Sequence, residues 1–413
     1  MQRLSQLVWL IASLTLTMSL VGDGVYSIPI GALFLLSLIS LRFLDSGLSK
    51  TLEDRYLIYT WCGFTLFMAW FVFLDGWHTR ELDRPARFLL AIPVLLLLMR
   101  LPLPKIPFLF YGVISGAFAS LIVASHDRFW LDLPRAQGGE NAIMFGDTAM
   151  MLGFMSCAAL MYFYAKRQSV MCLLSVLGVL SGVSASFLSG SRGGWIAAPF
   201  IAFFILWQSR ELFSRKLLMG GIAMAMTSLA LAVAIPQTGI QHRIQAAFVD
   251  LGKYQQGDSN TSVGLRLDMW KSSFYLVAES PVFGEGQYGS SAIREELAAK
   301  GVIHPHAAKF DHLHNEYLTS LGFQGIVGLV CLLLVYLVPL RLFMKKVKRY
   351  DDNWEIKPYA LAGALIPMCY MDFALTQAMF SHNIGVMMYA FPIIFFWVAL
   401  RWQERHFATC KAG

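Results

Sequence analysis

The residues best suited to chemistry lie in one short polar stretch, Asp311-His312-Leu313-His314-Asn315-Glu316. Imidazole is the side chain that most often removes a proton from a hydroxyl group near neutral pH. His314 directly precedes an apolar run that predicts a helix over 317–340, and the positive end of that helix disfavours the charged imidazolium. The sequence therefore predicts His314 as a general base. A histidine that only caps a membrane helix remains an alternative.

Polar neighbours of His314 are candidates for a supporting role, namely His312, Asn315 and Glu316. Residues two positions apart lie on opposite sides of a regular helix, so His312 and His314 are not expected to bind one metal ion from a helix. The six cysteines are dispersed, and none lies in the long polar loop that contains the histidines, so no disulfide framework or thiolate metal site is expected there.

Two further motifs contain arginines. Arg192 lies in a glycine-rich turn, where glycines allow a ligand to approach the backbone closely. Arg266 and Trp270 share one face of a predicted helix, and a cation beside an aromatic ring suits an anionic headgroup or a sugar. The planar guanidinium forks match phosphate oxygens. Two alternatives stay open, an arginine anchored to lipid phosphates for Arg192 and a surface arrangement with Asp268 for Arg266.

The composition is that of a membrane protein. Of the 413 residues, 57% are hydrophobic and 14% are charged, whereas about a quarter of a soluble protein is charged. The formal net charge of +7 does not indicate nucleic-acid binding, because no basic run is interleaved with aromatic residues. The sequence thus predicts an all-α polytopic membrane protein with lipid around most of its surface.

Hydropathy predicts about twelve transmembrane helices. The first nine fall within residues 1–236, a polar loop domain follows over 237–313, and the last three helices and a tail occupy 314–413. Apolar positions at helical spacing in the polar loop predict a small helical cap, with a further short helix over 291–300. The predicted spans are 6–21, 25–41, 56–74, 87–101, 106–124, 142–165, 169–188, 194–209, 217–236, 317–340, 357–378 and 384–402.

The distribution of basic residues predicts the orientation of these helices. With both termini in the cytoplasm, the inner segments contain most of the 33 Lys and Arg residues, as the positive-inside rule requires. The same orientation brings Arg192, Arg266 and His314 to the outer face. Two guanidinium groups and one imidazole that face one cavity suit a lipid diphosphate and an alcohol.

The layout and motifs resemble the O-antigen ligases of lipopolysaccharide assembly, within a larger O-antigen ligase/polymerase superfamily. The resemblance covers essentially the whole chain, with a long loop between the ninth and tenth spans. The histidine motif is the most specific, and its His-Leu-His-Asn-Glu form favours the ligase branch. The motifs are, in order, Ser191-Arg192-Gly193, Gly264-Leu265-Arg266-Leu267-Asp268-Met269 and His312-Leu313-His314-Asn315-Glu316.

This resemblance implies an inverting, metal-independent glycosyltransferase of the GT-C type, without a cofactor. Such enzymes lie in the inner membrane of Gram-negative bacteria and act on the periplasmic side. They transfer O-antigen polysaccharide from undecaprenyl diphosphate to lipid A–core oligosaccharide. Carried over to this chain, Arg192 and Arg266 match the diphosphate-binding arginines, and His314 matches the catalytic histidine.

Three other functions compete with this interpretation. An O-antigen polymerase or a protein-glycosylating ligase shares the arginines and differs in the acceptor. A flippase for lipid-linked glycans is expected to have several charges along its transmembrane cavity, whereas the spans contain essentially Asp147 and Asp372. Asp372 is predicted to face the cavity and orient an arginine, and a helix-packing hydrogen bond is its alternative role.

Overall fold

The computed structural model describes residues 2–40, 42–44, 47–76, 78–191, 193–234 and 240–412. Within these ranges the regular structure is entirely helical. The first nine α-helices are α1 (Gln2–Thr17), α2 (Ser27–Ser40), α3 (Leu52–Leu74), α4 (Asp83–Arg100), α5 (Phe108–Ser125), α6 (Ala142–Ala165), α7 (Ser169–Ser189), α8 (Ala198–Ser209) and α9 (Arg215–Ala234). Short helical turns precede or follow some of them, namely η1 (Thr79–Leu82), the π-turn η2 (His126–Trp130) and η3 (Gly193–Trp195).

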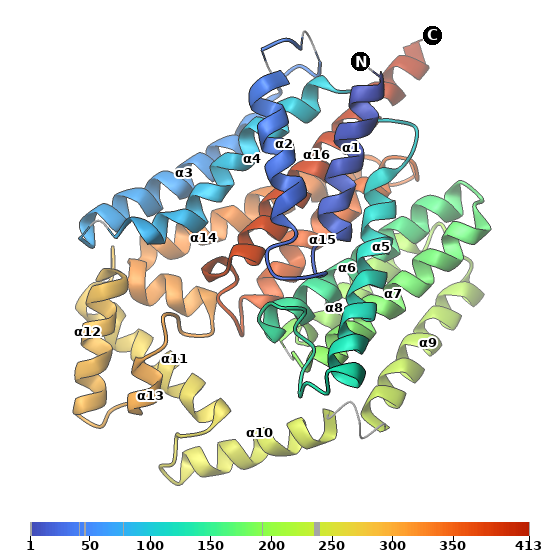
Figure 1. Cartoon of the computed structure of the whole chain (residues 1–413). Helices are drawn as coiled ribbons and strands as arrows, with labels where there is room; N and C mark the ends of the chain where they lie inside the picture. The colour runs from blue at the N-terminus through green and yellow to red at the C-terminus, as the bar shows by residue number, and fades with distance from the viewer. Residues whose placement is uncertain are drawn as a thin grey trace.

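Four helices form the segment between the two apolar halves, and three long helices close the fold. The former are α10 (Ile240–Gln255), α11 (Ser262–Glu279), α12 (Gly286–Ala299) and α13 (Pro305–Ala308), and the latter are α14 (Glu316–Arg349), α15 (Lys357–Phe373) and α16 (Asn383–Ala412), with the turn η5 (Met379–Ser381) before α16. Both chain termini lie at one end of the molecule, and α10–α13 lie at the opposite end (Figure 1).

The prediction of a multi-pass membrane protein is confirmed. Each of the twelve predicted apolar spans falls on a helix, and six helices of the described residues are long and apolar enough to cross a membrane. These are α3, α5 extended by η2, α6, α7, α14 and α16. Helices α2 and α8 are apolar but shorter. Twelve crossings and the relation to the GT-C type therefore stay predictions.

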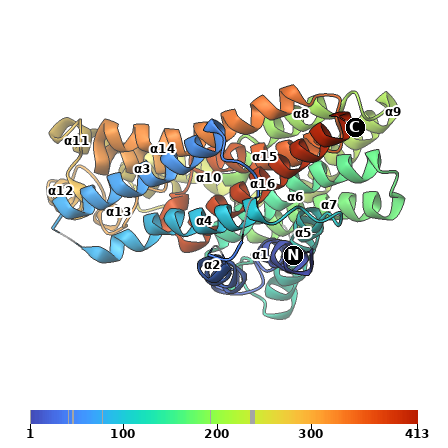
Figure 2. The same cartoon turned by 90° about the horizontal axis from the view of Figure 1, so that it is seen from above.

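The C-terminal helices form the centre of the bundle. Of the apolar window of α16, 94% is buried inside the protein, against 33% for α3, so α16 is surrounded by other helices and α3 has a large outward face. Helices α14, α15 and α16 lie side by side, and α1, α2 and α5 form one flank (Figure 2). Phe88, Phe380 and Tyr389 pack edge to face in this core, with ring centroids 5.2–6.2 Å apart.

The cap helices α10–α13 confirm the helical periodicity of the polar loop, with one correction. The predicted short helix over 291–300 begins earlier, at Gly286. The reason is a carboxylate far away in the sequence. Asp75, at the end of α3, accepts hydrogen bonds from the backbone N–H groups of Gln287 (2.8 Å) and Tyr288 (3.2 Å) and so caps α12.

A break in α14 ties the cap to the bundle. Gly325 has φ 65° and ψ −166°, a conformation that is essentially restricted to glycine. The backbone of the Pro281–Gly284 segment fills the break. The carbonyl groups of Pro281 and Val282 accept hydrogen bonds from the N–H groups of Ile326 (2.9 Å) and Val327 (3.2 Å). The first turns of α14 are thereby held as a separate short helix, and the histidine motif precedes them.

Candidate active site

The connector between α13 and α14 positions the predicted base. Asn315 is the N-cap of α14, and its Oδ1 accepts a hydrogen bond from the N–H of Leu318 at 3.0 Å. His314 precedes this cap and has φ +48°, one of only three non-glycine residues with positive φ among those described. His312 and His314 are therefore not helical. Their rings meet edge to face with centroids 4.5 Å apart, instead of lying on opposite sides of a helix.

Polar contacts surround the two imidazole rings. The Nδ1 atom of His312 accepts a hydrogen bond from the backbone N–H of His314 at 3.2 Å. The Nδ1 atom of His314 lies 2.9 Å from Oε1 of Gln377, and Nε2 of Gln377 lies 3.1 Å from Nε2 of His382. Gln377 and His382 come from the connector between α15 and α16, so two chain segments build one cluster of three histidines. We call His312, His314, Gln377 and His382 the histidine cluster.

The electrostatics of the cluster favour neutral imidazoles. Burial and, as a smaller effect, the positive charge of Arg266 lower the pKa of His314 to about 4, against a raising contribution from the Gln377 hydrogen bond. Burial and the neighbouring histidines likewise lower the pKa of His312 to about 3, and burial with Arg84 lowers that of His382 to about 4. The predicted direction is confirmed, but burial and Arg266 are its causes rather than the helix dipole alone.

The two polar residues that follow His314 build the scaffold. Besides capping α14, Asn315 donates a hydrogen bond from Nδ2 to the carbonyl of Leu375 at 3.0 Å. Glu316 is buried and accepts hydrogen bonds from the Tyr336 hydroxyl (2.6 Å) and from the backbone N–H groups of Met379 (3.2 Å) and Phe380 (2.7 Å). Both side chains therefore fix the connector around Gln377 relative to the start of α14.

Helix α11 brings the second motif to the same place. The charge of Arg266 acts on His314, and Trp270, one turn further, donates a hydrogen bond from Nε1 to the carbonyl of Leu313 at 3.0 Å. Trp270 thus supports the chain immediately before His314. Asp268, on the same helix, accepts hydrogen bonds from the backbone N–H of His304 (2.7 Å) and the hydroxyl of Tyr254 (3.2 Å), which ties α11 to its neighbours in the cap.

The first motif packs against the connector that contains Gln377, although Arg192 itself lies outside the described residues. A Cβ atom on Gly193 would come within 2.3 Å of the hydroxyl of Thr376, the residue before Gln377, so the turn packs directly against this connector. Asp147 accepts hydrogen bonds from the Ser191 hydroxyl (2.8 Å) and the N–H of Gly194 (3.2 Å). The described residues Ser191, Gly193 and Gly194 therefore lie against α6 and against the connector that contains Gln377.

Asp372 holds the other end of the same turn. Its Oδ1 accepts a hydrogen bond from the N–H of Ala197 at 2.8 Å, at the start of α8. The alternative of a packing hydrogen bond thus has direct support, and the orientation of an arginine by Asp372 stays a prediction. Asp147 and Asp372 bind the two ends of the 191–197 segment from α6 and α15.

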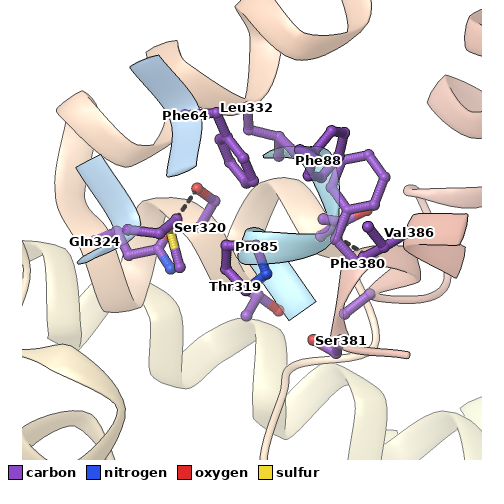
Figure 3. A pocket seen from close by; sticks show the side chains of 13 residues that line it. Phe64, Pro85, Phe88, Thr319, Ser320, Gln324, Leu332, Phe380, Ser381 and Val386 are labelled. Carbon is purple, nitrogen blue, oxygen red and sulfur yellow. Dashed lines mark hydrogen bonds between the residues drawn. The ribbon is translucent and has the colours of Figure 1, made fainter. Parts of the chain in front are cut away.

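A cavity of about 90 Å³ lies between α3, α4 and the first turns of α14, next to the part of the connector from Ala378 to Ser381 (Figure 3). Phe64, Phe88 and Leu332 line one side, and Thr319 and Ser320 line the other, with Ser320 hydrogen-bonded to Gln324 at 3.0 Å. This volume has room for several water molecules. The cavity is therefore too small to contain a glycan.

Sequence reasoning missed Gln377 and His382. His382 lies between the last two predicted spans, whereas Gln377 lies at the end of the predicted span 357–378, because α15 ends at Phe373 and the prediction extended this helix too far. Three ring nitrogens of the cluster contact a backbone N–H group or the Gln377 amide, namely Nδ1 of His312, Nδ1 of His314 and Nε2 of His382. In the part of the chain that the structure describes, no group of three or more His, Cys, Asp or Glu residues has the geometry to hold a metal ion.

Comparison with known proteins now adds the family. The family model for O-antigen ligases matches residues 177–333, which include all three motifs. The chain is 30% identical to an uncharacterized protein of Haemophilus influenzae over 386 residues, which are 92% of this chain and 94% of that relative. It is 27% identical to the O-antigen ligase of Escherichia coli K12 over 193 residues, 46% of this chain and 44% of that relative.

The chain belongs to the O-antigen ligase family. The recognition made from the motifs is confirmed by this match. The matched segment begins in α7 and ends within α14, so it contains the turn at position 192, the cap and the histidine motif. Gln377 and His382 lie beyond it.

Proposed function

We propose that this O-antigen ligase family member is a glycosyltransferase that transfers O-antigen polysaccharide from undecaprenyl diphosphate to lipid A–core oligosaccharide. The observation that carries the proposal is the environment of His314. A neutral, half-buried imidazole whose pKa is lowered by the cation Arg266 supplies a base near an anion-binding group. General base catalysis and neutralisation of a leaving diphosphate are the two needs of this reaction.

The reaction consists of one displacement. The oxygen of a core-sugar hydroxyl attacks the anomeric carbon of the donor glycan, and the bond from that carbon to the diphosphate oxygen breaks. The attack occurs opposite to the leaving group, so the anomeric configuration inverts. The proton of the hydroxyl moves to the ring nitrogen of His314 that faces the substrate. The products are glycosylated lipid A–core, undecaprenyl diphosphate and a proton held by the imidazole.

Two arginines replace a metal ion in this proposal. As the oxygen of the diphosphate leaves, negative charge grows on it, and the guanidinium groups of Arg192 and Arg266 neutralise that charge. Support for Arg266 comes from its effect on His314, and support for Arg192 comes from the packing of Gly193 against Thr376. Other residues are proposed to position the base and the two arginines without contacting the substrate. These are Trp270, His312, Asn315, Glu316 and Asp372.

The proposal places the site on the periplasmic side of the inner membrane. The positive-inside distribution puts both termini in the cytoplasm, and the termini and the cap lie at opposite ends of the molecule (Figure 1). Both substrates have lipid tails that stay in the membrane. A tag at Gln256, in the turn between α10 and α11, is therefore expected to be accessible in spheroplasts, and tags at the termini are not.

A reconstituted assay tests the function. Purified protein in liposomes receives undecaprenyl-diphosphate-linked O-antigen and lipid A–core, and the mass of the acceptor is followed. A glycan added to lipid A–core supports the ligase. Extension of the lipid-linked glycan without lipid A–core indicates a polymerase instead, and transfer to a protein acceptor indicates a protein-glycosylating ligase. Movement of the donor across the bilayer without transfer indicates a flippase and contradicts the proposal.

A further inference from the structure

Gln377 is completely buried and joins the predicted base to a second histidine. Its side-chain amide lies between Nδ1 of His314 (2.9 Å) and Nε2 of His382 (3.1 Å). A glutamine amide has one accepting end and one donating end, so the direction in which it is oriented decides which ring nitrogen on each side bears a proton.

A backbone group fixes this direction. The N–H of Ala378, which is always a donor, points at Oε1 of Gln377 at 3.3 Å. In the reversed orientation this N–H would face the donating NH₂ group and two donors would meet. Oε1 is therefore the end that faces His314, and Nε2 is the end that faces His382.

The tautomers of both imidazoles follow. An accepting Oε1 requires that Nδ1 of His314 has the proton, so Nε2 of neutral His314 has the lone pair. A donating Nε2 of Gln377 requires that Nε2 of His382 has a lone pair, so its Nδ1 has the proton. His312 is set independently, because its Nδ1 accepts the backbone N–H of His314.

We infer that Gln377 is a positioning residue that holds His314 in the tautomer with a basic Nε2, and that the N–H of Ala378 sets the direction of the Gln377 amide while His382 binds its donating end. This inference rests on the proposed function, because a tautomer matters only if His314 accepts a proton. Gln377 does not take up that proton. It binds the Nδ1–H group in the neutral state and in the imidazolium that forms.

A neutral partner also explains the low pKa of the base. A carboxylate at the position of Gln377 would stabilise the imidazolium, whereas an amide does so weakly. The groups that act on His314 are Arg266 of α11, His382 and Gln377, and those that act on His312 and His382 include Arg294 of α12 and Arg84 of α4. The carboxylate of Asp311 acts on Arg294, and no acidic group is among the causes of the lowered pKa values of the three histidines. Positive charge thus predominates around the cluster, and His314 stays neutral at periplasmic pH.

Three substitutions at this position separate orientation from packing. Gln377→Leu keeps the volume and removes both hydrogen bonds, and we expect transfer to fall about 10- to 100-fold, as for other partners that orient functional histidines. Gln377→Asn is too short to span both rings and should retain part of the activity. Gln377→Glu faces the Nδ1–H group of His314 with a carboxylate. The acidic limb of the pH–rate profile should then move up by about 1 to 3 pH units.

The reconstituted transfer assay, run from pH 4 to pH 8 with undecaprenyl-diphosphate-linked glycan and lipid A–core, measures these effects. Gln168→Leu, the same change at an exposed residue at the start of α7, is the matched control and should behave as wild type. Size-exclusion profiles and binding of the lipid-linked donor show that each variant is folded. His382→Leu should cause a smaller loss than Gln377→Leu, because only the support of the amide is removed.

Wild-type rates for Gln377→Leu, or an unshifted acidic limb for Gln377→Glu, would overturn the inference and leave the proposed function intact. If Gln377→Leu does not fold, the pH profile of Gln377→Glu decides alone. Failure of the wild-type protein to transfer any glycan would instead remove the proposed function, and this inference with it.

Discussion

Charged and titratable side chains lie at both ends of the helical bundle, but their hydrogen-bond and ion-pair partners differ. At the end with the termini, buried cations are paired with carboxylates. Nζ of Lys346 lies 2.7 Å from Glu53 and 2.8 Å from Glu404, and Arg401 lies 3.3 Å from both Asp54 and Glu404. At the other end, imidazoles are partnered by an amide and by the backbone, and the arginine that acts on His314 adds like charge.

This difference separates stabilisation from function. A buried cation with two carboxylates satisfies its charge within the protein, so the terminal end holds α3, α14 and α16 together. A titratable group whose pKa is moved from its ordinary value by burial and by nearby like charge is typical of binding sites and active sites. The surroundings of His314 lower its pKa, and a bound anion such as a diphosphate would relieve that effect. The comparison predicts opposite responses of activity and stability to substitutions at the two ends.

The largest effect is expected at the base. His314→Ala should lower the rate of transfer by about 10²- to 10⁴-fold, because general base catalysis is removed while no large apolar packing is lost. Transfer is followed in the reconstituted assay, and folding is followed by thermal unfolding and donor binding. His312→Ala is the matched histidine control and should cost less. An essential His312 with a dispensable His314 would reverse the assignment.

A substitution at the end of the bundle with the chain termini should lower stability and leave activity unchanged. Lys346→Ala removes the buried cation that the half-buried Glu53 and Glu404 share, and the free energy of unfolding should fall by about 1.5 to 3 kcal/mol, because each carboxylate keeps one other cation. The rate of transfer per folded molecule should stay at the wild-type value. Exposed Lys345, which also lies 2.9 Å from Glu53, is the control, since Lys345→Ala should change stability by less than about 1 kcal/mol. A loss of rate without a loss of stability would show that the two ends are coupled.

A smaller effect is expected when Arg266 keeps its positive charge but loses the shape of the guanidinium group. Arg266→Lys keeps the positive charge but loses the planar fork, so donor binding and transfer should fall by about tenfold. Arg210→Lys, on the exposed surface near the end of α8, is the matched control. Wild-type rates in Arg266→Lys would mean that Arg266 acts only as bulk positive charge.

The pH dependence sharpens the comparison further. His314 is a base only when neutral, so kcat/KM should fall as the pH drops through about 4, the lowered pKa in the free enzyme. Bound diphosphate neutralises Arg266 and adds negative charge, which raises the pKa of His314. The acidic limb of kcat should therefore lie at higher pH than that of kcat/KM. Coincident limbs would show that the donor does not bind beside His314.

Local sequence patterns were sufficient to predict the helices and to recognise the family from its motifs. Apolar runs and helical periodicity depend on neighbours in the chain, and α14 continues to Arg349 simply because polar residues there can remain helical. Long-range contacts could not be predicted from the sequence. Asp75 caps α12 from the end of α3, the Pro281–Gly284 backbone fills the break at Gly325, and Gln377 meets His314 from another connector. Each of these depends on packing that no single segment encodes.

The smallest expected effect is that of metal removal. Many glycosyltransferases hold the donor diphosphate with a divalent ion on paired carboxylates. The adjacent pair Asp351 and Asp352 lies on the cytoplasmic side in the predicted orientation, and Glu316 is fully occupied by Tyr336 and backbone N–H groups. Arginines can supply the same neutralisation. Transfer should therefore keep its rate in excess EDTA. A loss that added Mg²⁺ or Mn²⁺ restores would mean that carboxylates hold the diphosphate, and the charge contrast between the two ends would then lose its functional meaning.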